Sequence, residues 1–218
     1  MNSRYEEWLK HVFDHVVTEK LPEWYWDESA PTFEASQSEI TELLSETFLR
    51  AGKDLIKYTD AQLNQGIWYV VSPPCSDFIH ALKSPEVPLA KRLEAIGNIF
   101  NLYSDCFAKR CAETLGHLSG EGSPLNLCCY MFWDISYLDY AKDIPDGKQM
   151  EEAALNVLQK ILTIEHRACR EGALHGLSGY ALAGNKKAHQ IIDQFLSNTK
   201  LDDQLLAYAR NAREGNVL

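Results

Sequence analysis

The sequence has no apolar run long enough to cross a membrane. Its longest strongly apolar stretch, from Leu125 to Trp133, is far short of the roughly 20 residues that a spanning helix needs. The first residues, MNSRYEEWLKHVFDH, lack the basic-then-apolar order of a secretory signal. We therefore expect a cytoplasmic protein that does not associate with membranes.

Signatures of catalysis and of cofactor binding are also missing. The chain contains no GxSxG nucleophile elbow, no phosphate-binding P-loop and no Rossmann glycine pattern. Its six cysteines lack the paired spacing of a zinc site, and we interpret them as reduced thiols in the core. These absences favour a protein without cofactor or metal, and a binding protein over an enzyme.

Strand signals are few, whereas helical periodicity extends through most of the chain. The one β-branched cluster, Ile67 to Val71, lies between a helix start at Thr59 and the Pro73-Pro74 pair, so a helix ending before the prolines is the simpler interpretation. Elsewhere apolar residues recur every three or four positions, as at Leu89, Leu93, Ile96, Phe100, Tyr103 and Phe107. The sequence predicts a nearly all-α fold with roughly eight to ten helices.

Capping residues mark several helix starts. Ser36 with Glu39, and Thr59 with Gln62, have the spacing of capping boxes. Ser84 before Pro85 predicts a further start, and the first helix is expected over about 4–19.

We expect one helical domain over 1–218, and the alternative is a subdivision near residue 145 into an irregular part (1–145) and stacked hairpins (146–218).

The last third of the chain predicts stacked helix pairs, 148–165 with 167–183 and 185–197 with 201–214. Small residues recur on one face of 167–183, including Gly172, Ala173 and Gly176, which would let a neighbouring helix approach closely. Over Ala168 to Leu182 and Ala188 to Leu196 the sequence resembles HEAT-like α-helical repeat proteins. The resemblance implies antiparallel hairpins stacked as an α-α superhelix or irregular bundle, and a protein-binding role.

The charge is negative and uneven. The chain carries a net charge of −10, and its first 50 residues contain eleven acidic and four basic side chains. Such a surface repels nucleic acid and attracts basic partners, although many proteins carry a similar balance for solubility alone. We expect no nucleic-acid binding and a protein partner of basic character.

Two aromatic clusters are mixed with acidic residues. Glu23, Trp24, Trp26, Asp27 and Glu28 form one, in a segment expected to be a loop, and we interpret them as a partner-binding surface. The second surrounds Asp134 and Asp139 and contains Tyr130, Phe132, Trp133, Tyr137 and Tyr140. Core packing is the simpler reading of this second cluster.

Two pairs of titratable residues have helical i, i+4 spacing. Glu171 and His175 form a candidate polar site, because a carboxylate one turn from an imidazole can orient it; the alternative is a structural surface pair. His11 and His15 have the spacing of zinc ligands, but the HExxH motif is absent and a solvated face explains them as well. We therefore expect no catalytic, cofactor-binding or metal-binding residue that the sequence alone can identify.

Three functions remain open. The first is a non-enzymatic protein-binding module, similar in general character to bacterial immunity proteins, in which acidic groups steer a basic toxin and aromatics anchor it. The second is a hydrolase-like enzyme with a polar site around Glu171 and His175. The third is a structural subunit that pairs through an apolar helix face, so both a monomer and a homodimer are compatible with the sequence.

Overall fold

A computed structural model describes residues 3–18, 23–118, 121–138, 144–197 and 202–217, and within these ranges every regular element is a helix. The α-helices are α1 (Ser3–Phe13), α2 (Gln37–Leu49), α3 (Ala51–Asp54), α4 (Asp60–Val71), α5 (Leu89–Asn101), α6 (Ala108–Arg110), α7 (Leu125–Ser136), α8 (Gly147–Ile161), α9 (Arg167–Leu182), α10 (Lys186–Leu196) and α11 (Asp203–Arg213). Short 3₁₀ turns occur at η1 (Trp24–Trp26), η2 (Phe78–Lys83) and η4 (Gly116–Leu118), and a π-helical turn at η3 (Leu102–Phe107) joins α5 to α6. The all-α prediction is confirmed.

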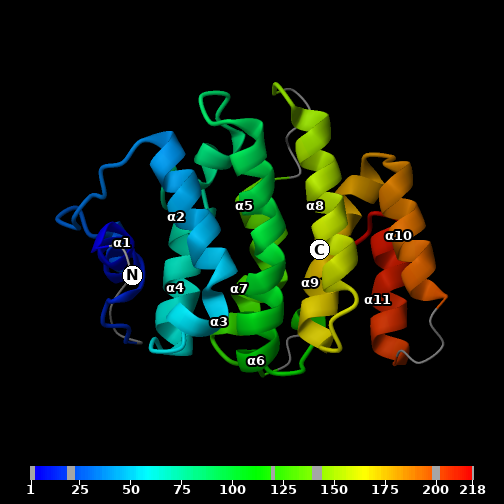
Figure 1. The fold of residues 1–218 in the computed structure, drawn as a ribbon. Coiled ribbons are helices and arrows are strands. Elements are labelled where there is room, and N and C mark those ends of the chain that lie inside the picture. Colours follow the sequence, from blue (N-terminus) through cyan, green and yellow to red (C-terminus); the bar gives the residue numbers. More distant parts are fainter. Residues whose placement is uncertain (1–2, 19–22, 119–120, 139–143, 198–201, 218) are drawn as a thin grey trace.

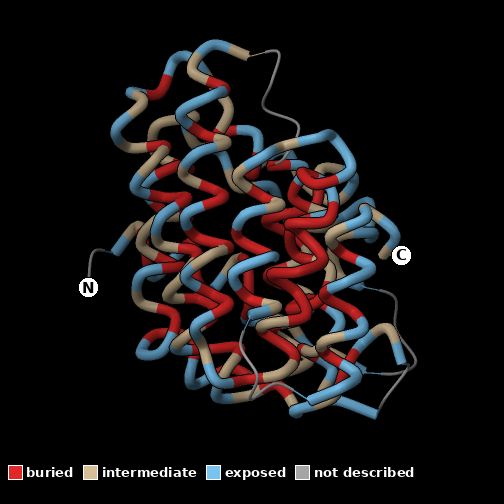
Figure 2. Tube along the Cα trace, turned by 90° about the vertical axis from the view of Figure 1, so that its right-hand side faces the viewer, coloured by how far each residue is buried: buried red, intermediate tan, exposed pale blue. Residues whose placement is uncertain are grey.

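The long helices form two layers (Figure 1). In one layer α2 packs against α5, and α5 against α8; in the other α4 packs against α7, α7 against α9, and α9 against α11. Successive long helices alternate between the layers, so the chain builds a stack of helix pairs. The buried residues concentrate in the interior of this stack (Figure 2). The HEAT-like identification stays a prediction.

Helix α9 approaches α7 closely because two of its small residues are glycines. A Cβ atom built on Gly172 would lie 2.4 Å from the carbonyl oxygen of Cys129, and one on Gly176 would lie 2.7 Å from Cγ of Trp133. The predicted close approach therefore occurs. The helix in close contact with α9 is α7, and α8 lies between the two along the chain. Helix α10 packs elsewhere on α9.

Two predicted boundaries are wrong. Helix α1 ends at Phe13, and Val16 is 81% exposed. The β-branched run Val16–Val17–Thr18 has low helix propensity, and the Nε2 atom of His15 lies 2.6 Å from the carbonyl oxygen of His11, at the end of the helix. Residue 19 lies outside the described residues.

The helix expected from Ser84 begins instead at Leu89, after a second proline, Pro88. A proline disfavours helical geometry in the residue before it, so a helix started at Ser84 could not continue through Val87. The helix start predicted at Thr59 is confirmed: Thr59 and Gln62 form a complete capping box at the start of α4. This box satisfies two free backbone N–H groups at the start of α4, the helix that contributes Trp68 to the site described below.

Candidate functional site

The loop that carries the predicted partner-binding residues is fixed to the protein by Trp24. Its indole stacks on the imidazole of His15, with ring centroids 3.8 Å apart and planes within 7°, and its edge meets Tyr69 at 4.5 Å. Tyr25 stacks on Tyr69 as well, at 5.4 Å. Trp24 and Tyr25 therefore cover the edge of the core, and they hold the rest of the loop in place.

Trp26 and the three acidic residues of this loop face solvent. The Trp26 side chain is 54% exposed, and Glu23, Asp27 and Glu28 are all exposed. The Oδ1 atom of Asp27 accepts hydrogen bonds from the backbone nitrogen and the hydroxyl of Ser29, at 2.8 and 2.7 Å. These bonds lower the pKa of Asp27, so it stays ionised.

The acidic residues of α2 are in a different situation, because basic side chains neutralise them. Glu39 pairs with Arg4 at 2.7 Å, Glu42 pairs with Lys91, and Glu46 pairs with Arg50 at 3.7 Å. Within the described part of the chain, Glu23, Asp27 and Glu28 have no such ion pair. These three loop carboxylates therefore add uncompensated negative charge next to Trp26.

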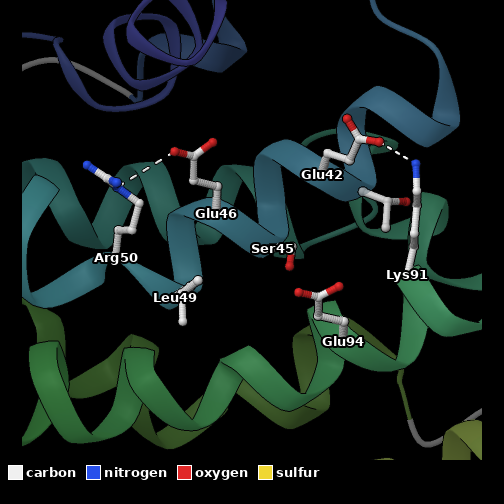
Figure 3. Close-up of a pocket in the computed structure, with 8 residues that line it drawn as sticks. Glu42, Ser45, Glu46, Leu49, Arg50, Lys91 and Glu94 are labelled. Atoms are coloured by element: carbon white, nitrogen blue, oxygen red, sulfur yellow. Dashed lines mark hydrogen bonds and ion pairs between the residues drawn. The ribbon is translucent and has the colours of Figure 1, made fainter. Parts of the chain in front are cut away.

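A groove of about 380 Å³ lies between α2 and α5 (Figure 3). The carboxylates of Glu42, Glu46 and Glu94 line it, but so do the cations of Arg50 and Lys91. Its charges are nearly balanced by these pairs, so the groove offers little net field to a charged ligand.

A larger hollow, of about 560 Å³, lies beside Trp26. Its lining residues come from the loop, from α4 and its C-terminal end, and from α7 and α9, and include Trp26, Trp68, Cys75, Met131, Asp134 and Tyr137. Asp134 is the one charged residue among the described residues that line it. The hollow thus combines aromatic walls with the Asp134 carboxylate, and it joins the predicted loop to the second aromatic cluster.

Asp134 leads from this hollow to a buried polar network. Its Oδ2 atom lies 2.8 Å from Nε2 of His175, and the Nδ1 atom of the same imidazole lies 2.8 Å from the Tyr208 hydroxyl. The Tyr208 and Tyr130 hydroxyls are 3.1 Å apart. Because a carboxylate only accepts hydrogen bonds, Nε2 carries a proton and donates it to Asp134. The network ties α7, α9 and α11 together, and burial raises the pKa of Tyr208 far above its usual range.

Glu171 belongs to a separate set of contacts, although it lies one turn from His175. Its carboxylate is 1% exposed and accepts hydrogen bonds from the backbone nitrogens of Gly116, at 2.6 Å, and His117, at 3.1 Å. The Nδ1 atom of His117 lies 2.5 Å from the same carboxylate. Glu171 thus holds the η4 turn against α9, and the structure does not join it to His175.

His11 of α1 and His15, which lies just after this helix, do not converge on a common point either. His11 faces the Tyr69 hydroxyl at 3.3 Å, whereas His15 contacts the His11 carbonyl and the Trp24 ring. Burial lowers the pKa of His11 to about 4, which favours its neutral form. In the ranges that the structure describes, no group of three or more His, Cys, Asp or Glu side chains is placed to hold a metal ion.

Five of the six cysteines are buried, and Cys75 is half-buried. A hydrogen bond with Cys129 and a second with His166 lower the pKa of Cys169, while burial raises the pKa of Cys129. Cys169 and Cys129 are both fully buried, so neither thiol faces the hollow.

The sequence did not identify Trp68 and Tyr208 as site residues, and it assigned the surroundings of Asp134 to the core. Phe132 and Trp133 are indeed buried, but Asp134 and Tyr137 are exposed. The signal was present in α7, because Asp134 is the one charged residue of this helix and lies one turn after Tyr130. Asp139 and Tyr140 lie outside the described residues.

Comparison of the chain with protein-family models, with curated proteins and with solved structures gave no significant match. None of the helices in the described ranges has the length and apolar character required to span a bilayer.

Proposed function

We propose that this protein is a non-enzymatic binding module for a basic protein partner. One observation carries the proposal: an exposed tryptophan, Trp26, stands among three uncompensated acidic residues at the rim of an aromatic hollow. Exposed aromatic side chains are the usual anchors of protein interfaces. Acidic residues at a rim accelerate association with basic partners.

The loop is suited to this role because it is held in place before a partner arrives. Trp24 and Tyr25 pack on His15 and Tyr69. The backbone that leads into Trp26 is therefore supported by the core. A preorganised anchor loses less conformational entropy on binding than a flexible one. The partner would be neutralised stoichiometrically, as an immunity protein neutralises a toxin, in the cytoplasm of a bacterial cell; the six free thiols suit a reducing compartment.

The geometry favours this role over a hydrolase. Both nitrogens of His175 have partners, Asp134 and Tyr208, and the ring is 4% exposed. A general base needs a nitrogen within reach of the substrate proton. His175→Ala should therefore lower the melting temperature, because it removes the hydrogen bond to Asp134 and the buried one to Tyr208, and a buried group that loses its partner costs about 1–3 kcal/mol. A loss of turnover of any substrate with unchanged stability would instead support the enzyme.

The experiment is a capture with two matched triple variants. Glu23→Gln, Asp27→Asn and Glu28→Gln remove three charges from the loop. The control, Glu86→Gln, Glu94→Gln and Asp105→Asn, removes three exposed charges from elsewhere on the surface. Proteins that bind the wild type and the control, but not the loop variant, are then purified and titrated.

We expect a captured partner with a net positive charge, whose association rate falls as salt rises, because screening weakens attraction between exposed charges. A 1:1 complex that blocks an activity of the partner would support the immunity-type role. Equal capture by the loop variant and the wild type would refute the proposed surface. Sedimentation of the free protein separates a monomer from the alternative homodimeric subunit.

A further inference from the structure

We propose that the hollow beside Trp26 receives an arginine side chain of the partner, with its guanidinium group on the Asp134 carboxylate. The inference rests on the proposed function, and it specifies the chemistry that the surface recognises. It depends on three features of the hollow: the Asp134 carboxylate, the way that carboxylate is held, and the aromatic walls.

The first feature is the isolated charge. Asp134 is the single charged residue among the described lining residues, and 51% of its side chain is exposed. The groove between α2 and α5 differs, because Lys91 and Arg50 of the protein already occupy positions beside its carboxylates. No cation is among the described residues that line the hollow; the nearby Lys83 ammonium donates to the carbonyl oxygen of Tyr137 rather than to Asp134.

The second feature is the support behind Asp134. The Nε2 atom of His175 donates to Oδ2 from the buried side, at 2.8 Å, and Tyr208 holds the other nitrogen of this imidazole at 2.8 Å. The carboxylate therefore has a fixed orientation while its exposed part still accepts hydrogen bonds. Fixed carboxylates suit the planar, two-pronged donor geometry of arginine.

The third feature is the aromatic lining, to which Trp26, Trp68 and Tyr137 contribute. A cation is attracted to the face of an aromatic ring, most strongly to tryptophan. A guanidinium group is flat and weakly hydrated, so it can stack on such a ring more readily than an ammonium group can. The volume of about 560 Å³ lies within the range of ordinary ligand pockets, about 300–1,000 Å³, and accommodates a long side chain.

The test uses the full chain and three short peptides, acetyl-Gly-Xaa-Gly-amide, in which Xaa is arginine, lysine or citrulline. Citrulline has nearly the shape of arginine without its charge. Binding is followed by NMR through the indole N–H signals of Trp26 and Trp68, assigned with the Trp26→Phe and Trp68→Phe variants. We expect saturable shifts of both signals with the arginine peptide, and binding of the citrulline peptide weaker by roughly tenfold or more, because a charge-assisted hydrogen bond is lost.

Variants separate the carboxylate from the fold. Asp134→Asn should weaken binding of the arginine peptide by roughly tenfold and keep the helical circular dichroism spectrum, since an amide oxygen still accepts the His175 hydrogen bond. Glu94→Gln, in the groove between α2 and α5, should leave binding unchanged. Trp26→Ala, at an exposed position, should weaken the shift of the Trp68 signal.

Four results would overturn the inference: no shift with the arginine peptide, equal binding of citrulline, equal binding of lysine, or shifts that depend on protein concentration alone, which would place a second copy in the hollow. A partner captured through the loop charges could still exist in each case. Failure of this inference is therefore distinguishable from failure of the proposed function.

Discussion

Replacing Gly172 with alanine should destabilise the protein, although alanine is the better helix former. The added Cβ would lie 2.4 Å from the carbonyl oxygen of Cys129, so α7 and α9 would have to separate by roughly 1 Å to reach ordinary contact distance. Overpacking of this kind costs about 1–3 kcal/mol. The same oxygen accepts a hydrogen bond from the Tyr103 hydroxyl at 2.9 Å, and weakening that bond costs about 1 kcal/mol more.

The helix propensity of alanine offsets only about 1 kcal/mol of this cost. We therefore expect a net loss of about 1–3 kcal/mol in the free energy of unfolding. For a chain of this size the melting temperature should fall by roughly 2–4 °C per kcal/mol. Urea denaturation followed by circular dichroism at constant m value measures the change.

Gly97 of α5 provides the matched control. It is exposed, and a Cβ built there meets no atom within 4 Å. Gly97→Ala should therefore stabilise the protein by about 0.5–1 kcal/mol. If Gly172→Ala were as stable as Gly97→Ala, the close contact between α7 and α9 would not exist and the account of the small-residue face would be wrong.

Two further predictions concern titratable groups. The free energy of unfolding should fall as the pH drops from 6.5 towards 4. Burial lowers the pKa of His11 from 6.5 to about 4, so the unfolded chain binds a proton that the native state excludes. His11→Gln should flatten the dependence of the melting temperature on pH in this window, and an unchanged slope would contradict the assignment to His11. In the native state only Cys75 should react with an aromatic disulfide reagent, and slowly, because the other five thiols are buried and only exposed thiolates react. All six thiols should react in urea. Rapid reaction of more than one thiol in the native protein would show that the core opens.

Much of the architecture was predictable because its causes are local. Capping at Thr59 and the apolar period of the long segments depend on residues within one or two helical turns. The small face of α9 also correctly predicted a close neighbour. The identity of that neighbour was not predictable, because α7 reaches Gly172 through tertiary packing that the spacing along the chain does not encode.

The candidate site was predictable only in part, for the same reason. Composition indicated the loop with Trp26 and its acidic residues. The partner of His175 is Asp134, 41 residues away, instead of Glu171, one turn away. Helical spacing places Glu171 and His175 on similar sides of α9, but each meets a different neighbouring element, and those elements decide which hydrogen bonds form.

The position of the loop at one end of the stack has a consequence for local unfolding. Helix α9 is enclosed by α7, α8, α10 and α11, whereas α1 at the opposite edge packs mainly on α4. Edge elements with few neighbours open first, and Trp24 and Tyr25 rest on this edge through His15 and Tyr69. A partner that binds Trp26 would therefore suppress fraying of α1. Protection of this helix from proteolysis and from amide hydrogen exchange would report occupancy of a surface several residues away.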